Sequence, residues 1–514
     1  MSVIARRPAA ASFARAILAS LAASLLAACA TTRTPATQAS ASEVNARGPD
    51  GSTALLWAAH RGDAATVARL IREGANVSLA NRYGASPMSE AATMGNAAIL
   101  ELLINGGANA NSPNPEGETA LMEVARTGQV DAAKLLLRRG ASVDAHESWG
   151  GQTALMWAAA QRQPAMVKLL IAHHADVNAR AVVRDWQRRV TAEGRPKDMR
   201  RGGLTPLLFA ARQDCIECVK DLLAGGADIN LSDPDGVTPL EIALLNLHWD
   251  LAKELISAGA DVNAWDSWGQ SPIYVAVDMN TVPLGGRPEL PSTDKTTGME
   301  VIELLLDRGA DPNLQLKVAP PLRQAVFDRG ADPMLTIGAT PLLRAAQAAD
   351  LPAMRLLLAR GALVDLPNFD GETPLLVAAG AGRNKRTTRG ALRTEIQAIA
   401  AYELLRDHGA NVHAANRDGE TAMHAAALRG WDQLVEILAR DGVALDTPAT
   451  SGLTPLDFAM GRYKPGFLEP TPTPNLKTAA LLRQLGAKVE HTHLPKWRGV
   501  PTPTITAQVP QLLQ

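Results

Sequence analysis

The chain has 514 residues, a formal net charge of −1 and a hydrophobic fraction of 46%, with only 4% aromatic residues. A chain with so little net charge has no global field to hold it on nucleic acid or on an anionic membrane, so a dedicated DNA-binding protein is excluded. The three cysteines, Cys29, Cys215 and Cys218, form neither a disulfide framework nor a four-ligand zinc pattern.

The first 28 residues have the layout of an export signal. Three arginines precede an apolar run from Ala16 to Ala28, which is too short to span a bilayer. The run ends in Leu-Ala-Ala-Cys and so resembles a bacterial lipobox, which implies that Cys29 is lipidated and becomes the first residue of the mature chain. The alternative is an ordinary cleavage site with an incidental cysteine. No later segment has 18 uninterrupted apolar residues.

The residues after Cys29 predict where the chain is held. Ala30 stands where an Asp would resemble an inner-membrane retention signal, so the expected location is the outer membrane, facing the periplasm. Residues 29–48 contain many Ala, Thr and Ser residues and are expected to form a flexible tether.

A short motif, Gly-x-Thr/Ser-Pro/Ala, then recurs eleven times, and six of the ten steps between copies are 33 residues. Its Thr or Ser is a good helix N-cap, and Pro at the first helical position gives up no intrahelical bond. A second apolar helix follows each one and ends at a Gly, and an Asn/Asp-Gly-rich connector leads to the next copy. We call the Thr or Ser of each copy the anchor: Thr53, Ser86, Thr119, Thr153, Thr205, Thr238, Ser271, Thr340, Thr373, Thr421 and Thr454.

These residues resemble the ankyrin repeat, from about Pro49 to Glu490. The stretch Thr421-Ala422-Met423-His424 is closest to the family's Thr-Pro-Leu-His, whereas the other repeats replace the His. The resemblance implies an all-α solenoid of about eleven helix-turn-helix repeats with short β-hairpin connectors and several loop insertions. Residues 491–514 then form a Pro/Thr-rich C-terminal tail.

The longer steps locate the insertions. In the repeats anchored at Ser271, Thr373 and Thr454 the extra residues are expected between the two helices, and in two other places they are expected in the connector. One of these connectors contains residues 314–338, which are either a degenerate half repeat or a loop. The other, 180–201, carries eight basic and three acidic residues, with Trp186, Arg188 and Arg189 among them. It is either a solvated loop or a docking site for an acidic partner, lipid headgroups or a polyanion.

No constellation of catalytic residues is present. The chain lacks a phosphate-binding loop, a nucleophile elbow and a His-Glu-x-x-His helix, so we predict no enzyme, cofactor, metal site or small-molecule substrate. Cys215 and Cys218 are the one pair with redox potential, and they form a disulfide, remain reduced core residues, or carry out thiol chemistry.

Large aromatic residues divide into two groups. Trp57 and Trp157 share one repeat position and are expected in the core. Trp149, Trp268 and Tyr83, like Trp265 and Phe369, fall in connectors, where exposed aromatic residues are typical binding anchors and packing on the next connector is the alternative. The resemblance also places Arg61, Arg126, Arg212 and Arg429 on the binding groove.

The leading hypothesis is a membrane-tethered, periplasmic protein-interaction scaffold with an unknown protein partner and no nucleic-acid ligand. One alternative is an envelope-structural protein that contacts a polyanion through loop 180–201, and another is a thiol redox protein that uses Cys215 and Cys218.

Overall fold

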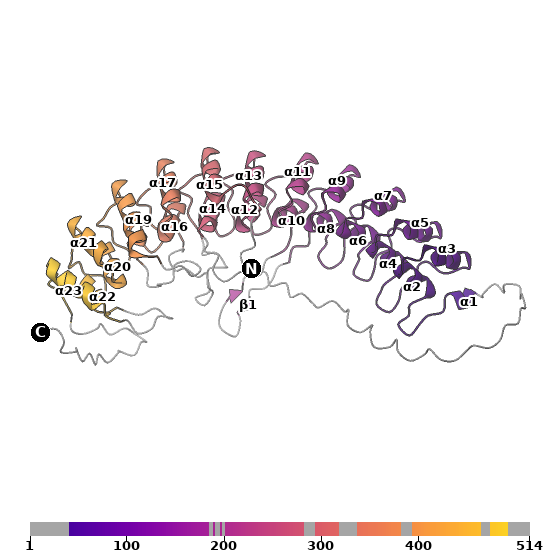
Figure 1. Ribbon diagram of the computed structural model, residues 1–514, viewed down its shortest axis with the longest axis horizontal. Coiled ribbons are helices and arrows are strands. Elements are labelled where there is room, and N and C mark those ends of the chain that lie inside the picture. The colour runs from indigo at the N-terminus through magenta and orange to yellow at the C-terminus, as the bar shows by residue number, and fades with distance from the viewer. Residues whose placement is uncertain are drawn as a thin grey trace, which may run out of the picture.

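The computed structural model describes residues 41–184, 189–190, 196–197, 201–281, 293–317, 337–381, 393–463 and 473–491. The described helices stack side by side into a long arc (Figure 1). Even-numbered helices from α2 onward lie along the concave edge and odd-numbered helices from α3 onward along the convex edge, with connectors that project below the concave edge. The predicted ankyrin-repeat solenoid is confirmed.

Each repeat contains one inner and one outer helix. The inner helices are α2 (Ala54–His60), α4 (Pro87–Thr93), α6 (Ala120–Thr127), α8 (Ala154–Ala160), α10 (Pro206–Arg212), α12 (Pro239–Leu245), α14 (Pro272–Asn280), α16 (Pro341–Ala348), α18 (Pro374–Ala378), α20 (Ala422–Arg429) and α22 (Pro455–Ala459). The outer helices are α3 (Ala64–Arg72), α5 (Ala97–Asn105), α7 (Val130–Arg138), α9 (Pro164–Ala172), α11 (Ile216–Ala224), α13 (Trp249–Ser257), α15 (Gly298–Asp307), α17 (Leu351–Ala359), α19 (Glu395–Asp407), α21 (Asp432–Arg440) and α23 (Leu476–Leu485).

The anchors begin the inner helices because they act as N-caps, as predicted. All eleven anchors are N-caps in extended backbone geometry, and nine of them accept a hydrogen bond from a first-turn amide. Thr53, for example, accepts from the Leu56 amide at 3.2 Å. The sequence motif therefore fixes the start of every inner helix.

His424 shows how the best-matched motif closes its own turn. Its Nδ1 accepts a hydrogen bond from the Thr421 amide, so Nε2 carries the proton and donates to the Leu453 carbonyl in the next repeat. Burial lowers the pKa of His424 to about 4, because the charged imidazolium would lose its hydration. The ring is therefore neutral at pH 7, as this bonding pattern requires.

One continuous apolar core runs along the arc between the helix layers. Alanine pairs such as Ala58-Ala59 and Ala378-Ala379 are fully buried, and their small side chains let neighbouring inner helices approach closely. Because each helix pair contacts mainly the pairs next to it, the core is built by stacking rather than by any single repeat.

A second, polar ladder joins the repeats behind the outer helices. The Asn263 side chain donates to the Gly309 carbonyl at 2.9 Å and accepts from the Asp311 amide at 2.8 Å in the next repeat. Asn313 makes the same pair of bonds to Gly361 and Leu363. The asparagines at the repeat ends therefore hold successive repeats in register.

The connectors differ from the expected β-hairpins. Three of them have an isolated bridge beside the anchor, as between His146 and Thr153, and no strand. The described strands are β1 (Arg189–Val190) and β2 (Pro196–Lys197), which pair antiparallel inside loop 180–201. In these three connectors a single backbone pair therefore closes the turn.

The insertions lie where the spacing places them. α14 is separated from α15 by residues 281–297, α18 from α19 by 379–394, and α22 from α23 by 460–475. Most of the stretch 314–338, interpreted as a degenerate half repeat or a loop, lies outside the described residues.

The two ends of the array extend beyond the predicted boundaries. α1 (Ala41–Val44) and the residues after it fall within the expected tether, yet Val44 is buried and Asn45 bonds to Gly74 and Asn76. At the other end, His491 bonds to the buried Asp457. The signal peptide, Cys29 and residues 492–514 lie outside the described residues.

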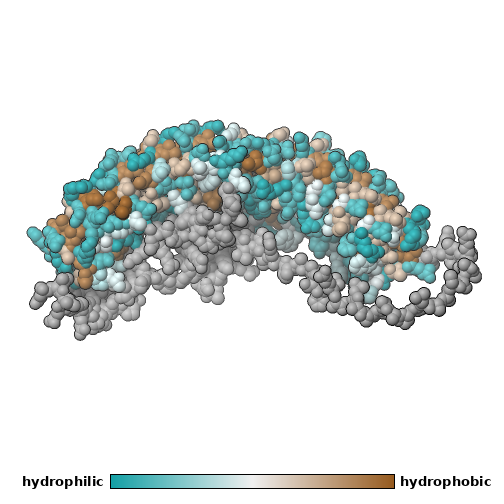
Figure 2. Space-filling view, in the orientation of Figure 1, coloured by the Kyte–Doolittle hydropathy of each residue, from teal (hydrophilic) through white to brown (hydrophobic). Residues whose placement is uncertain are grey.

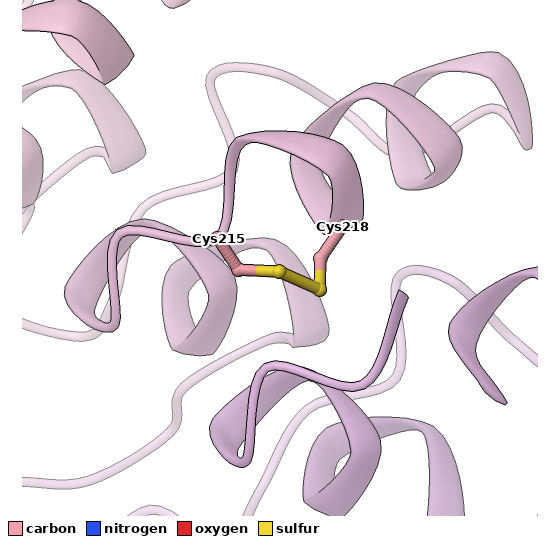
Figure 3. The surroundings of a disulfide bond; sticks show 2 residues. All are labelled: Cys215 and Cys218. Atoms are coloured by element: carbon pink, nitrogen blue, oxygen red, sulfur yellow. A yellow bond between two sulfur atoms is a disulfide. The ribbon is translucent and has the colours of Figure 1, made fainter. Parts of the chain in front are cut away.

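Cys215 and Cys218 are joined by a disulfide at the start of α11 (Figure 3). Cys215 is the N-cap and Cys218 lies in the first helical turn. Elsewhere this position carries residues such as Asp63 or Asn96, whose side chains accept a first-turn amide. The disulfide therefore ties together the two residues that a capping box would join by hydrogen bonds.

Candidate functional site

The connector tips form one row along the array. In most repeats an Asn or Asp side chain holds the turn, as Asp233 does by accepting the amides of Asp235 and Val237 at 2.9 Å. Backbone bonds then join tip to tip, for example from the Arg82 amide to the Asp50 carbonyl at 3.0 Å and from the Arg417 amide to the Asp370 carbonyl at 2.8 Å. The row is therefore a pre-organised edge.

Exposed aromatic side chains lie along this row of tips. In several of them a cationic side chain from the following tip lies over the aromatic ring. Tyr83 is 79% exposed and Trp149 is 73% exposed. The Arg184 guanidinium lies 4.9 Å from the centre of the Trp149 ring, and Arg417 lies 3.9 Å from that of Phe369. One face of the Trp149 ring and one face of the Phe369 ring are thus covered by an arginine of the array itself.

Trp268 differs from the expectation of an exposed anchor. It is half-buried and packs against the core, while its amide donates to Asp266 and its carbonyl accepts from Lys317. Its neighbour Trp265 is the exposed residue at this tip, with the Lys317 ammonium over its ring. Trp268 is therefore a packing residue, because the turn directs it toward the array.

The concave face is defined by one position in every inner helix. In α2 the residues one and two steps from Trp57, such as Leu55 and Ala58, are buried, whereas Trp57, His60 and Arg61 share the opposite, exposed face. We call the fourth residue after each anchor the groove position. It is occupied by Trp57, Glu90, Glu123, Trp157, Phe209, Ile242, Val275, Arg344, Val377, Ala425 and Phe458.

The groove positions divide the array into two segments. In the first four repeats Trp57 is 45% exposed and the other three residues are half-buried. In the fifth to eleventh repeats none of the seven is more than 5% exposed. We call the first segment the open groove and the second the closed groove.

The expectation that Trp57 lies in the core is wrong. Its side chain points to the concave side, and the next groove positions along the array hold the polar residues Glu90 and Glu123, which leave nearly half of the indole uncovered. Trp157, at the same repeat position, packs partly on the core and has the Arg126 guanidinium 5.8 Å from its ring centre. The two tryptophans therefore line the open groove at its two ends.

The acidic residues of the open groove have partners within the array. The Glu90 carboxylate lies 2.8 Å from Nδ1 of His60, and Glu123 pairs with Arg126 at 2.6 Å. The predicted groove residue Arg61 is exposed, and Arg126 is exposed but paired. Arg212 is half-buried over the Phe209 ring, at 5.0 Å from its centre.

The arginines of the closed groove bond within the fold. Arg344 is fully buried, and its Nε lies 2.5 Å from Oδ1 of Asp278 in the preceding repeat. The predicted binding residue Arg429 instead donates to the Gly380 carbonyl at 2.9 Å. Arg462 pairs with both Asp457 and Glu490. These three arginines are therefore held by bonds within the array.

Two carboxyl groups beneath the connectors are buried with incomplete hydrogen bonding. Burial and the neighbouring Asp266 raise the pKa of Glu241 well above its ordinary value. Burial raises the pKa of Glu372 to about 7, and the hydrogen bond from Asn416 opposes this shift. Each has one oxygen without a hydrogen-bond partner. Protonation relieves the cost of burying these charges.

Several arginines of loop 180–201 donate hydrogen bonds to backbone carbonyls of the array. Arg180 donates to the Gly203 and Ser232 carbonyls, and Arg184 donates to the Trp149 carbonyl. Arg201 donates to the Pro234 carbonyl. Trp186, Arg188 and the Arg189 side chain lie outside the described residues.

The described residues contain no group of three His, Cys, Asp or Glu side chains placed to hold a metal ion. Among them we also find no helix with the length and apolarity needed to cross a membrane. Cys215 is 5% exposed and Cys218 is fully buried, so neither sulfur presents a reactive surface.

Comparison with known families agrees with the repeat geometry. The family described as ankyrin repeats (3 copies) matches residues 24–114, 90–181 and 192–285. The chain contains ankyrin repeats. Together with the eleven capped helix pairs, this makes the described chain an ankyrin-repeat array that continues well past the matched residues.

Curated proteins with ankyrin repeats resemble parts of this array. Human ankyrin repeat and SOCS box protein 16 is 32% identical over 159 residues, which cover 26% of this chain and 34% of that protein. The tankyrase poly(ADP-ribose) polymerase of Caenorhabditis elegans is 34% identical over 133 residues, 24% of this chain and 6% of that protein. Palmitoyltransferase AKR1 of Saccharomyces cerevisiae is 44% identical over 46 residues, 9% of this chain and 6% of that protein.

The matched segments span about a third of the relatives' length or less. Among solved structures, the ankyrin repeat domain of Bcl-3 is 22% identical with a TM-score of 0.39, over 50% of this chain and 99% of that domain.

The division into an open and a closed groove was not predicted from the sequence. The groove position carries Trp, Phe, Ile, Val and Ala as well as Glu and Arg, so its composition gives no sign of which repeats are covered. The one available signal is that all the long steps follow the fourth anchor.

Proposed function

We propose that the chain is a membrane-tethered scaffold in the periplasm that binds a protein partner through its open groove. Ankyrin-repeat arrays are protein-binding modules with extended concave surfaces, which supports the general class. The observation that carries the location is the contrast in exposure between the groove positions of the first four repeats and those of the other seven. A partner can reach Trp57 but not the residues of the closed groove.

The open groove has the composition of an interaction surface. It offers two tryptophans with polar and charged residues between them, and Met94, near the end of the second inner helix, is 56% exposed. Aromatic residues and arginines are enriched where protein partners bind, whereas fully paired buried charges are not. The exposed aromatics Tyr83 and Trp149 extend this surface onto the connector tips.

The tether is proposed from the N-terminal sequence. Lipid on Cys29 would anchor the mature chain, with each buried methylene contributing about 0.8 kcal/mol. The chain between Cys29 and the first repeat then sets the distance from the membrane, and Ala30 favours the outer membrane. The array would face the periplasm.

Substitution Cys29→Ser tests the tether. We expect the variant to move from the membrane fraction to the soluble fraction, because it can no longer carry the proposed lipid anchor. The matched control is Cys218→Ala, which breaks the buried disulfide to Cys215 and should leave the fractionation unchanged. A Cys29→Ser chain that stays with the membrane would contradict the tether.

A further inference from the structure

Two buried carboxyl groups meet between the sixth and seventh repeats. Glu241 lies in the inner helix α12 and is fully buried, and Asp266 lies in the connector that follows and is 1% exposed. The Gln270 side chain donates to both of them, to Oε1 of Glu241 at 3.4 Å and to Oδ2 of Asp266 at 3.1 Å. The two carboxyl groups also lie within hydrogen-bond reach of each other. We call Glu241 and Asp266 the carboxyl pair.

The hydrogen bonds around the carboxyl pair show which member holds a proton. Two carboxylates only accept hydrogen bonds, so their contact requires a proton on one of them. Asp266 accepts on both oxygens, because Oδ1 takes the amides of Trp268 and Gln270 at 2.9 and 2.8 Å and Oδ2 takes the Gln270 side chain. Oε2 of Glu241 accepts no hydrogen bond from the described residues. Glu241 is therefore the protonated member.

The charges around Glu241 favour that proton. Helix α12 packs against α10, α13 and α14, and the charged or titratable side chains of these three helices are Arg212, Asp250, Lys253, Glu254, Tyr274 and Asp278. Arg212 lies over the Phe209 ring, and Asp278 pairs with Arg344. The largest charge effects on Glu241 come from Asp266 and from Asp233 on the preceding connector, and both are negative.

Packing alone does not call for a carboxyl group at this position. Glu241 is the third residue after its anchor, and six other repeats carry Leu or Met there: Leu56, Met122, Met156, Leu208, Leu343 and Leu376. The last repeat carries Asp457, which lies 3.3 Å from the Arg462 guanidinium. Glu241 faces a carboxylate instead of a cation, so its bond to the next repeat depends on a proton.

The connector that contains Asp266 is linked to both of its neighbours. The Ser267 amide donates to the Asp235 carbonyl at 2.8 Å, and the Trp268 carbonyl accepts from the Lys317 amide at 2.8 Å. The helices on either side of it, α12 and α14, lie near the middle of the arc (Figure 1). A change in the position of Asp266 would therefore act on the row of tips at its centre.

We propose that the carboxyl pair is a proton-dependent latch that holds the connector of residues 264–270 on α12. While the pair shares one proton, an O–H···O hydrogen bond ties Asp266 to Glu241. Loss of the proton leaves two negative charges in contact in a buried site, and the connector separates from α12 so that water reaches both carboxylates. The latch does not rest on the proposed function.

The direction of the pH effect follows from the two states of Glu241. Burial and the neighbouring Asp266 raise the pKa of Glu241 well above 4.5 in the latched state, whereas a solvated Glu241 in the open state has the ordinary value. The latched state therefore keeps a proton that the open state releases. Opening is rarest below pH 4.5, rises about tenfold with each pH unit above it, and levels off beyond the raised pKa.

Hydrogen–deuterium exchange of the purified full chain tests the latch, with protection factors corrected for the intrinsic exchange rate at each pH. The readout is the protection of the Trp268 and Gln270 amides, which donate to Asp266. Above about pH 5 their protection should fall about tenfold per pH unit and then reach a plateau. In Glu241→Gln the carboxamide donates to Asp266 without titrating, so the protection should stay constant.

Two controls separate the latch from general effects of pH. The connector of residues 81–85 is an internal control, because Asn81 holds it by accepting the amides of Tyr83 and Ala85 at 3.0 Å and does not titrate. Its protection should not change. Glu303→Gln removes the same charge from the exposed surface of an outer helix and should keep the pH dependence of the native chain.

A second variant guards against a specific effect of glutamine. Glu241→Leu places there the residue that the preceding repeat carries as Leu208, and it should also give protection that does not change with pH. Thermal melting checks that both variants fold. Constant protection in the native chain, or the same fall in Glu241→Gln, would overturn the latch. An equal fall at Tyr83 and Ala85 would also contradict it, because the whole array would then be opening.

Discussion

Replacement of Arg344 by Ala should lower the free energy of unfolding by about 3–5 kcal/mol, because it leaves the Asp278 carboxylate buried without its cation. Arg344 is fully buried, and its Nε lies 2.5 Å from the Asp278 side chain, which itself is 7% exposed. The two residues come from successive inner helices, α16 and α14. Urea unfolding followed by circular dichroism measures the loss.

A double substitution distinguishes a missing partner from a missing side chain. Arg344→Met with Asp278→Leu removes both charges and keeps apolar volume, so it should be far less destabilising than Arg344→Ala alone. A single variant as stable as the unsubstituted chain would show that the closed groove does not depend on this ion pair.

Replacement of Glu372 by Gln should remove a pH dependence of stability. Burial raises the pKa of Glu372 from 4.5 to about 7, so the folded state binds a proton that the unfolded state releases at lower pH. The stability is then greatest below about pH 4.5 and falls as the pH rises through 7. A shift of this size corresponds to about 3 kcal/mol lost above pH 7.

The Gln variant keeps the oxygen that accepts from the Asn416 side chain, at 2.8 Å in the native chain, and does not titrate. The variant should therefore be more stable than the native chain at pH 8 and similar to it at pH 4.5. Taking the difference between the two chains at each pH cancels the contributions of Glu241 and His424. A constant difference across this range would show that Glu372 does not titrate as described.

The helical scaffold follows from local rules that the sequence states directly. Nine of the eleven anchors accept a hydrogen bond from an amide three residues away, so Thr53 or Thr454 can be interpreted without any knowledge of the rest of the chain. The same holds for the insertions, because extra residues cannot enter a capped helix and must leave between elements. Spacing alone therefore predicted most of the fold.

The binding surface depends on contacts that local rules do not contain. Trp57 and Phe209 occupy the same repeat position, yet one is 45% exposed and the other 5%. Arg429 and Arg61 also share a position, but the Arg429 guanidinium donates to the Gly380 carbonyl in the preceding repeat, whereas Arg61 makes no such bond and has Asp63 as its electrostatic neighbour. The exposure and bonding of two residues at the same repeat position therefore depend on the residues that surround each of them in space.

Photo-crosslinking in intact cells tests the open groove most directly. A photoreactive amino acid is placed at Trp57 or Met94 in the open groove, at Phe369 on a tip of the closed segment, and at Ile396 on an outer helix, all of which are exposed. We predict one discrete crosslinked protein from the first two positions and none from the last two. Crosslinks of equal yield at Ile396 and Trp57, or at Phe369 alone, would contradict binding through the open groove.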